Sequence, residues 1–258
     1  MEKVITVNNI YKTFSKNTRQ PSCISIIENL NLEINCGEFV TIFGPNGCGK
    51  TTFLNILAGL LSPDKGQVLI RGKNPYTGKT GYVFQNFTET LFPWRKNIDN
   101  IAFPLELKGI PKAERYKNVI ELEENLNIKI DNDSYPYKSS GGQQQLVSIA
   151  RALIDQPDVL LMDEPFNALD LQTRISMEDE ILNIWEKTKT TILFVSHDID
   201  EAIYLADRML FFTKMPAKIA EIIEVKLPRP RNQQMLASNE FFNLRNKAIE
   251  IFRKVTSK

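Results

Sequence analysis

Hydrophobic and polar positions in the first forty residues follow the pattern of β-strands. Residues 4–7 (Val-Ile-Thr-Val) favour a strand, and Leu30, Leu32 and Ile34 alternate with polar residues. A continuous apolar run over residues 39–43 follows and ends at a glycine-rich turn. Such a run is typical of a buried strand. The first part of the chain is therefore predicted to be rich in strands.

Helical spacing follows this turn and dominates the middle of the chain. One face of a predicted helix that ends near Gly59 carries Phe53, Ile56, Leu57 and Leu60. From about residue 87 to residue 155 the pattern is helical, and Pro111 stands where it could open a helix. Beyond it, apolar residues recur at Val119, Leu122 and Leu126. We expect this stretch to form a helical insertion.

Strands and helices alternate in the last hundred residues. Residues 159–162 and 191–195 read as buried strands, and helices are predicted over about 171–187 and 198–207. This alternation predicts an α/β fold with a mostly parallel core sheet. The Pro-Arg-Pro-Arg stretch at 228–231 predicts an extended spacer. After it, a packed amphipathic surface helix is predicted from the spacing of Phe241, Leu244, Ile249 and Phe252.

Composition excludes several classes of protein. The chain has 258 residues, of which 42% are hydrophobic and 24% charged, as in an ordinary globular protein. Its 32 Lys and Arg against 31 Asp and Glu exclude a strongly basic nucleic-acid binder. No apolar run approaches the roughly 20 residues that span a bilayer, and the N-terminus lacks a signal-peptide core. The cysteines at 23, 36 and 48 lack metal or disulfide spacing. We expect a soluble intracellular protein that a partner would bring to any membrane.

Residues 44–51 match the phosphate-loop pattern G-x-x-x-x-G-K-[ST]. Between a buried strand and a helix, the backbone N–H groups of such a loop point at phosphate oxygens. Pro45 has no N–H, so the donors are expected from Gly47 onward. Lys50 would reach the β- and γ-phosphates, and the Thr51 hydroxyl would ligate Mg²⁺. The alternative is a turn that only joins strand to helix, and Cys48 is interpreted as a small loop residue rather than a nucleophile. The candidate nucleotide-binding residues here are Gly44, Pro45, Asn46, Gly47, Cys48, Gly49, Lys50, Thr51 and Thr52.

Two further strand ends carry candidate catalytic residues. Asp163 and Glu164 end the run at 159–162, and alternation along the strand would separate their side chains. Asp163 would hold Mg²⁺ directly or through water, and Glu164 would polarise the attacking water. The alternative is an exposed acidic turn. His197, the only histidine, lies at the C-terminal edge of a predicted parallel strand, where ligands bind in such sheets. The alternative is a capping or surface histidine.

The order of these segments resembles the ATP-binding cassette (ABC) ATPases. The resemblance rests on GPNGCGKTT, Gln85 after the strand GYVF, SSGGQQQ, LLMDEPFNALD and VSHD. It implies a P-loop NTPase fold with a mostly parallel core sheet, an antiparallel β subdomain and an inserted helical subdomain. The whole chain, 1–258, would be one nucleotide-binding domain, with a helical signature subdomain at about 87–155 and a C-terminal tail and helix at about 214–258.

The resemblance also assigns roles to residues. Ser139-Ser140-Gly141-Gly142-Gln143 resembles the signature motif LSGGQ, and Asn167-Ala168-Leu169-Asp170 resembles the D-loop. In a head-to-tail dimer, each ATP would lie between one phosphate loop and the signature of the partner subunit. The implied nucleotide-binding residues outside the phosphate loop are Phe14 stacking on adenine (with Tyr11 as the competitor), Gln85, Ser140, Gly141, Gly142, Gln143, Asp163 and Asp170. The implied catalytic residues are Glu164 as general base, His197, Gln85 and Lys50, and the implied Mg²⁺ ligands are Thr51, Gln85 and Asp163.

Two further segments narrow the resemblance to importers of the nitrate, sulfonate and taurine class: LFPWRKNIDNIAFPLELKGIPKAER after Gln85, and the tail LPRPR with its closing helix. Importers of vitamin precursors share these segments. This implies ATP and Mg²⁺ as cofactors, two transmembrane permease subunits, a solute-binding protein and a second ABC subunit, identical or paralogous. It implies no nucleic-acid partner and a cytoplasmic position, peripheral on the inner face of the cell membrane. A permease helix would dock near the Gln85 loop. The candidates for that contact are Leu91, Phe92, Pro93 and Trp94, although Leu91 and Phe92 could instead pack inside the helical subdomain.

Three other functional classes stay open at this stage: a soluble ABC ATPase acting on nucleic acid or ribosomes, a nucleotide sensor without turnover, and an exporter subunit. The sequence also departs from the family pattern at two positions. Ser139 replaces the usual leucine of the signature, which is expected to cost packing at the helix start. Leu146 stands where this subfamily has arginine, which would remove a polar contact.

Overall fold

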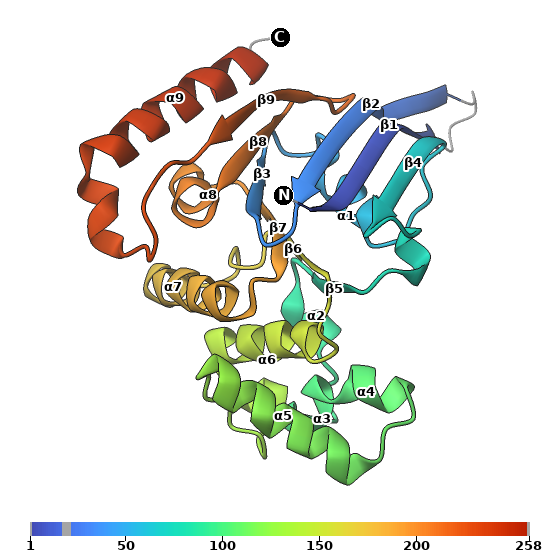
Figure 1. The fold of residues 1–258 in the computed structure, drawn as a ribbon, viewed down its shortest axis with the longest axis vertical. Coiled ribbons are helices and arrows are strands. Elements are labelled where there is room, and N and C mark those ends of the chain that lie inside the picture. Colours follow the sequence, from blue (N-terminus) through green and yellow to red (C-terminus); the bar gives the residue numbers. More distant parts are fainter. Residues whose placement is uncertain (1, 17–21, 257–258) are drawn as a thin grey trace.

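An antiparallel sheet forms one end of the molecule. The computed structural model describes residues 2–16 and 22–256, so the remaining residues of the predicted domain lie outside it. Strands β1 (Lys3–Lys16), β2 (Ser22–Asn35) and β4 (Lys65–Ile70) pair in the order β2-β1-β4 (Figure 1). Leu30, Leu32 and Ile34 are buried, as their alternation predicts. Both long strands extend well beyond the short runs that signal them in the sequence.

A second sheet forms the core. Its six strands lie in the order β5-β6-β7-β3-β8-β9, and all are parallel except β9. Every residue of β3, β6 and β7 is buried, which confirms the buried strands predicted from continuous apolar runs. The strands are β3 (Phe39–Phe43), β5 (Thr80–Val83), β6 (Val159–Asp163), β7 (Thr191–Ser196), β8 (Arg208–Phe212) and β9 (Ile219–Glu224).

The carboxyl ends of three neighbouring strands meet at one edge of this sheet. Phe43 at the end of β3 pairs with Ser196 at the end of β7, and Asp163 at the end of β6 pairs with Val195. The phosphate loop, the acidic pair and His197 each follow one of these strands. The topology therefore brings together segments that lie more than 150 residues apart in the chain.

Helices fill the middle of the chain, as expected, and form a separate lobe at the far end of the molecule from the antiparallel sheet (Figure 1). The elements are α2 (Phe87–Thr90), α3 (Asn97–Ile101), α4 (Phe103–Leu107), α5 (Lys112–Leu126), the 3₁₀ turn η2 (Pro136–Lys138) and α6 (Gly141–Leu153). Pro111 caps α5, whose Val119 and Leu126 are buried. The core of this lobe is continuous with one face of the central sheet, since both contribute to one apolar cluster.

The opposite face of the central sheet packs on α1 (Lys50–Leu57) and the antiparallel sheet. The prediction for the end of α1 is wrong at Leu60, which is 62% exposed. The helix ends at Leu57, and Gly59 at φ +72° turns the chain before Leu60 can join the buried face. A 3₁₀ turn, η1 (Pro75–Thr77), follows β4.

The C-terminal third packs around α8 (Ile199–Leu205). Helix α7 (Leu171–Thr188) precedes β7, and the 3₁₀ turn η3 (Gln233–Ala237) leads into α9 (Asn239–Thr256). Helix α9 lies along α8, β8 and β9 (Figure 1) and buries Phe241, Ala248 and Ile251, so the predicted amphipathic helix is packed. No helix within the described ranges is long and apolar enough to cross a bilayer.

The stretch at 228–231 does more than the extended spacer that its prolines predict. Arg231 is 8% exposed, and its guanidinium donates to the carbonyl oxygens of Ile203, Tyr204 and Ala206, at the end of α8. Arg229 donates to Leu205 O. Two arginines therefore satisfy the last carbonyl groups of α8, which have no partner within the helix.

Candidate active site

The phosphate loop follows β3 with the backbone that its glycines allow. Gly47 and Gly49 have φ angles of +72° and +113°. A Cβ at Gly49 would lie 2.9 Å from Cγ2 of Ile26 on β2, so a larger residue would be excluded by packing as well as by conformation. The Cys48 N–H donates to Pro45 O within the loop at 3.3 Å, so this N–H is already paired in the structure.

Lys50 crosses the inside of this loop. Its side chain is buried, and its ammonium donates to the carbonyl oxygens of Gly44 at 2.9 Å and Pro45 at 3.1 Å. Burial raises the pKa of the neighbouring Cys48 thiol, and a thiol kept protonated is a poor nucleophile. This favours the interpretation of Cys48 as a small loop residue.

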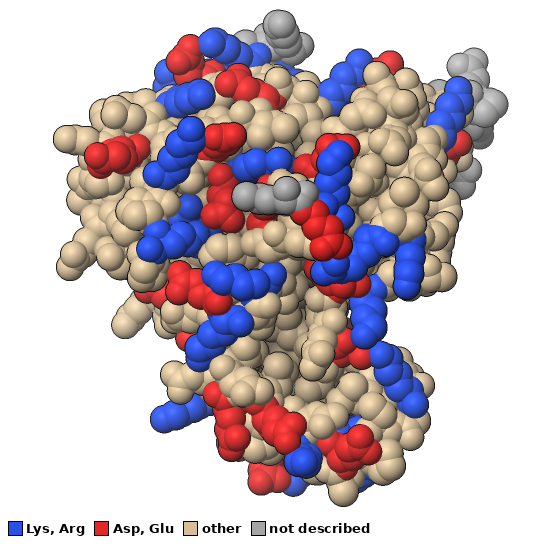
Figure 2. Space-filling model, in the orientation of Figure 1, with Lys and Arg blue, Asp and Glu red and all other residues tan. Residues whose placement is uncertain are grey.

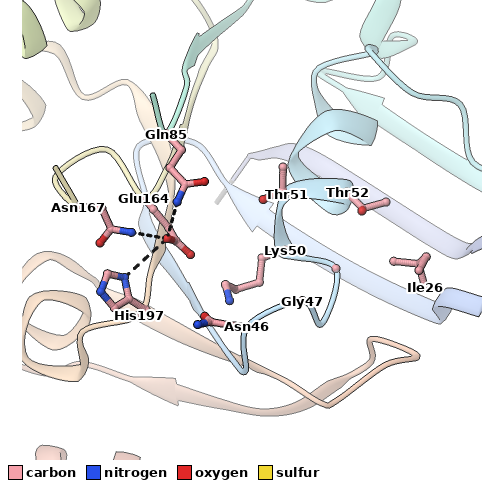
Figure 3. A pocket seen from close by; sticks show the side chains of 11 residues that line it. Ile26, Asn46, Gly47, Lys50, Thr51, Thr52, Gln85, Glu164, Asn167 and His197 are labelled. Carbon is pink, nitrogen blue, oxygen red and sulfur yellow. Dashed lines mark hydrogen bonds and ion pairs between the residues drawn. The ribbon is translucent and has the colours of Figure 1, made fainter. Parts of the chain in front are cut away.

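A cleft of about 480 Å³ lies over the loop at the meeting point of the strand ends (Figure 3). It brings together Lys50 and Thr51 of α1, Gln85 after β5, Glu164 after β6 and His197 after β7. Its remaining lining residues are Ile26, Asn46, Gly47, Gly49, Thr52 and Asn167. Ile26 and Asn167 were not among the candidate site residues. Nothing in the sequence pattern marks Ile26, whereas Asn167 stands three residues after Glu164 in the following turn.

Glu164 is the centre of the polar contacts in this cleft. Its Oε2 accepts hydrogen bonds from Gln85 Nε2 at 3.1 Å and Asn167 Nδ2 at 2.5 Å, and lies 3.7 Å from His197 Nδ1 (Figure 3). Strand β6 ends at Asp163, and Glu164 has a left-handed φ of +45°. The side chains of Asp163 and Glu164 are separated by this backbone turn. The prediction that alternation along one strand separates them is wrong, because Glu164 lies outside the strand.

Asp163 lies beneath the cleft with an unsatisfied oxygen. It is 3% exposed, and its Oδ1 has no hydrogen-bond partner within the described part of the chain. Burial raises the pKa of Asp163, the hydrogen bond from Thr51 lowers it, and the charge of Glu164 raises it. A buried carboxylate oxygen beside a threonine hydroxyl is a donor set that suits a hard cation such as Mg²⁺. The amide oxygen of Gln85 is a ligand of the same kind.

The predicted signature residues lie outside the cleft. Ser140 caps α6, and its Oγ accepts from Gln143 N at 3.3 Å. A Cβ at Gly142 would lie 2.8 Å from Cγ2 of Thr173, so glycine permits the close approach of α6 and α7. The single chain does not bring these residues, nor Gly141, to the phosphate loop.

Two other predicted nucleotide-binding residues also lie away from the cleft lining. Asp170 caps α7 by accepting from Thr173 N at 3.0 Å. Phe14 on β1 is 44% exposed and has the Lys12 ammonium 5.5 Å from its ring centre. Tyr11, the alternative aromatic, lies under the Lys65 ammonium at 5.9 Å.

The two departures from the family pattern have local explanations. Ser139 is fixed by polar contacts, because Asn97 Nδ2 donates to its Oγ at 3.2 Å and Gln144 Nε2 donates to its carbonyl at 3.0 Å. The bond to the hydroxyl is one that a leucine could not make, whereas the bond to the carbonyl does not depend on the side chain. Leu146 is 9% exposed and belongs to the apolar core, where an arginine would have to be desolvated.

A groove of about 380 Å³ opens between the Gln85 segment and the helical lobe. Its aromatic lining includes Phe84 and Phe92. Leu91 is 3% exposed and packs in the core, so of its two predicted roles the structure supports packing inside the helical subdomain. Trp94 is 73% exposed. The other lining residues are Thr80, Gly81, Tyr82, Thr90, Phe103, Pro104, Leu107, Arg151, Ala152 and Asp155.

Fold and site together define a P-loop ATPase with an inserted helical lobe. The family model described as ABC transporter matches residues 27–167, which include the phosphate loop and both carboxylates. The chain therefore belongs to the ABC transporter family, as an ATP-binding subunit with ATPase activity.

Curated relatives match almost the whole chain. An uncharacterized ABC transporter ATP-binding protein of Methanocaldococcus jannaschii is 44% identical over 256 residues, covering 98% of this chain and 92% of that protein. The aliphatic sulfonates import ATP-binding protein SsuB of Bacillus cereus is 42% identical over 252 residues, covering 96% and 95%. Among solved structures, a dimeric ATP-binding cassette in a post-hydrolysis state with ADP and Pi is 31% identical, with a TM-score of 0.73, and covers 87% and 100%.

Proposed function

We propose that this protein is the subunit whose ATP hydrolysis energises an importer of a small anion of the nitrate, sulfonate or taurine type. The likeness to sulfonate import proteins over 96% of the chain supports the direction and the solute class. The stretches after Gln85 and around LPRPR point the same way. An importer of vitamin precursors is the second candidate, because those stretches do not distinguish it.

The observation that carries the hydrolytic role is the position of the Glu164 carboxylate. It faces the cleft at the side opposite the phosphate loop, held by Gln85 and Asn167 and close to His197. A carboxylate there can accept a proton from an attacking water, while Lys50 stabilises charge on the β- and γ-phosphates. His197 would contact the γ-phosphate and orient that water.

Asp163, Thr51 and Gln85 are the proposed Mg²⁺ ligands. The orphaned, buried Oδ1 of Asp163 supports this assignment. Mg²⁺ bound with ATP would neutralise phosphate charge. The residues of the chain then supply orientation, since Thr51 lies in the first turn of α1 and Gln85 also holds Glu164.

A second ABC subunit would complete each nucleotide site. Ser140, Gly141, Gly142 and Gln143 form the start of α6, which lies outside the nucleotide cleft of the same chain. The helix N-terminus favours a negative charge, so the γ-phosphate of ATP bound to the partner subunit would suit it. Asp170 is proposed to lie at this interface, and Phe14 is proposed to stack on the adenine.

The aromatic groove beside Gln85 is the proposed contact with a permease subunit. Phe84 and Leu107 are exposed there, at 39% and 73%, which supports a partner that covers them. Phe92, Pro93 and Trp94 stay candidates for this contact, and buried Leu91 does not. The complete importer would add two permease subunits and a solute-binding protein, with this subunit at the inner face of the cell membrane.

A role on nucleic acid is not favoured by the charge distribution. Figure 2 shows blue and red side chains interspersed over one face of the molecule, without a broad basic surface. The formal net charge of the whole chain is +1. Sequence-independent binding to nucleic acid needs clustered Lys and Arg that pair with several phosphates.

The test is uptake in cells that lack this gene. We expect uptake of labelled nitrate, alkanesulfonate or taurine to fall in the deletion strain and to return with the wild-type gene. A gene for Glu164→Gln should not restore it, although the protein accumulates to the same level. Normal uptake of all three anions in the deletion strain would refute the proposed solute class, and restoration by Glu164→Gln would refute the role of hydrolysis.

A further inference from the structure

A buried carboxyl group contacts the residue that precedes His197, outside the cleft and unused by the mechanism above. Glu201 on α8 is 8% exposed, and its Oε2 is hydrogen-bonded to Ser196 Oγ. Ser196 is the last residue of β7 and immediately precedes His197. Neither Glu201 nor Ser196 lines the nucleotide cleft.

The number of hydrogens available to Ser196 Oγ indicates which protonation state of Glu201 satisfies its contacts. Ser196 Oγ accepts from Asp198 N at 2.9 Å and lies 3.1 Å from Asp198 O, to which it can donate. A hydroxyl group has one hydrogen and two acceptor sites. If Ser196 gives that hydrogen to Asp198 O, its contact with Glu201 needs a hydrogen from the Glu201 carboxyl. All three contacts are satisfied only when Glu201 is a neutral acid.

Ionisation of Glu201 would rearrange both neighbours of His197. A carboxylate can only accept, so Ser196 would have to turn its single hydrogen toward Glu201. The Asp198 carbonyl would then lose the hydroxyl donor and keep only the N–H of Ala202, at 3.0 Å. Since Ser196 and Asp198 flank His197 on either side, the backbone that carries the imidazole would change its hydrogen bonding.

We propose that Glu201 is a positioning residue for His197, acting as a neutral carboxylic acid that fixes Ser196 and Asp198 on either side of the histidine. It touches neither nucleotide nor metal ligand, and its effect passes through the Ser196 hydroxyl. The catalytic consequence rests on the proposed role of His197 in hydrolysis.

The surroundings of Glu201 keep the acid neutral near physiological pH. Burial raises the pKa of Glu201 to about 8, a hydrogen bond donated by Ser196 to the ionised carboxylate lowers it, the charges of Glu178 and Asp198 raise it, and Arg174 lowers it. The carboxylates of Asp179 on α7 and Asp200 on α8 also lie near Glu178. Asp200 pairs with Arg245 of α9. The charged groups that face this cluster are Arg174, Glu178 and Asp179 of α7, Asp198, Asp200 and Arg245.

Helix α8 is held at both ends, so Glu201 cannot move away from Ser196 easily. At the N-terminus, the Asp198 side chain accepts from Asp200 N at 2.9 Å and Glu201 N at 3.3 Å. At the C-terminus, Arg229 and Arg231 satisfy the last carbonyl groups. A change in the charge of Glu201 is therefore taken up by the loop around His197 rather than by the helix.

The chain offers a direct probe of this coupling, because His197 is its only histidine. The imidazole signals of the full-length, nucleotide-free protein, purified without a polyhistidine tag, can be followed by NMR from pH 6 to 9.5. We expect the His197 signals of the wild type to show, beyond their own titration, an inflection near pH 8 that reports Glu201. Glu201→Gln should abolish this inflection, because its amide can donate to Ser196 but cannot ionise.

Two further variants make the result specific. Ser196→Ala removes the connecting hydroxyl and should abolish the inflection while Glu201 stays in place. Glu180→Gln makes the same change at a different carboxyl group, which lies on α7 and is partly buried. Burial also raises the pKa of Glu180, and this variant should leave the inflection intact. A wild-type protein without an inflection near pH 8, or a Glu201→Gln protein that keeps it, would overturn the proposal.

Turnover provides the second measurement. As pH rises through about 8, wild-type kcat for ATP should fall, whereas that of Glu201→Gln should stay level. Glu201→Ala should lower kcat about tenfold with little change in KM, because a misplaced catalytic group costs turnover rather than binding. Equal kcat values for Glu201→Ala and wild type would contradict the positioning role. If instead His197→Ala hydrolyses ATP normally while the NMR coupling is present, the proposed role of His197 fails and the coupling stands.

Discussion

At the scale of single residues, the active site is organised by side chains that hold one another before any ligand is considered. Lys50 donates to two carbonyl oxygens of its own loop, and Glu164 accepts from two amides. Both side chains are thus fixed in direction. Pre-organisation of this kind lowers the cost of orienting catalytic groups when ATP binds.

Removing the Lys50 ammonium should weaken ATP binding. Lys50→Ala deletes the one buried cation of the loop, and we expect a dissociation constant at least about tenfold higher, since charge-assisted contacts to phosphate are the strong ones. Isothermal titration calorimetry measures this directly. Lys73→Ala removes an exposed lysine and serves as the control. An unchanged dissociation constant for Lys50→Ala would count against the assigned role of the loop.

Blocking Glu164 should separate binding from turnover. Glu164→Gln keeps the size of the side chain but cannot accept a proton, so ATP should still bind while phosphate release falls about 10²–10⁴-fold, the usual contribution of general base catalysis. A continuous phosphate-release assay gives the rate. Asn167→Ala removes only one hydrogen bond to Glu164 and should cost far less. Wild-type turnover by Glu164→Gln would show that another group is the base.

The sequence predicts which residues reach the cleft better than how they interact there. Lys50, Thr51, Gln85, Glu164 and His197 all line it, because their motifs follow parallel strands whose ends meet at one edge. The contact of Asn167 with Glu164 and the burial of Glu201 depend on the turn and packing around them. No spacing rule for a single chain contains that information.

At the scale of elements, the spacing of apolar residues and the capping residues predict the regular helices and strands. They do not predict the segments whose conformation depends on tertiary contacts. Continuous apolar runs identify β3, β6 and β7 because these strands are covered on both faces. The prolines at 228 and 230 are compatible with extended chain, but they do not reveal that the arginines between and after them bind the end of α8. Those bonds join residues more than 20 positions apart.

The interface of α7 and α8 should make stability depend on pH. Burial raises the pKa of Glu178 on α7 to about 7, the charge of Asp198 raises it, and Arg174 lowers it. The folded state therefore holds this proton to higher pH than the unfolded state does. The stability that the neutral acid contributes is fully present below about pH 4.5 and is lost as pH rises through about 7.

Glu178→Gln should remove this dependence, because an amide stays neutral at every pH. Relative to wild type, its free energy of unfolding should rise by up to about 3 kcal/mol between pH 4.5 and pH 8. Urea unfolding followed by circular dichroism at a series of pH values measures the difference. Glu124→Gln, at an exposed position of α5, should follow the wild type. A difference that stays constant with pH would show that folding does not shift the pKa of Glu178.

At the scale of the whole molecule, the two halves of the proposed nucleotide site lie on different parts of the chain. The phosphate loop belongs to the central sheet, and the capped start of α6 belongs to the helical lobe (Figure 1). A relative of known structure, which covers 87% of this chain, is dimeric with ADP and Pi bound. If each ATP joins two chains, assembly should require both ATP and an unobstructed α6 N-terminus.

Blocked hydrolysis makes this assembly measurable. Glu164→Gln with ATP should migrate in size-exclusion chromatography with light scattering at about twice the chain mass of 29.6 kDa, and with ADP at the mass of one chain. Adding Ser140→Asp keeps a good helix cap but places a negative charge where the γ-phosphate would bind, so the dimer should disappear. Adding Ser238→Asp instead makes the same change beside α9, where Ser238 Oγ accepts from Phe241 N, and should leave the dimer intact. Because both changes conserve a cap, a dimer that survives Ser140→Asp would mean that α6 does not meet the nucleotide.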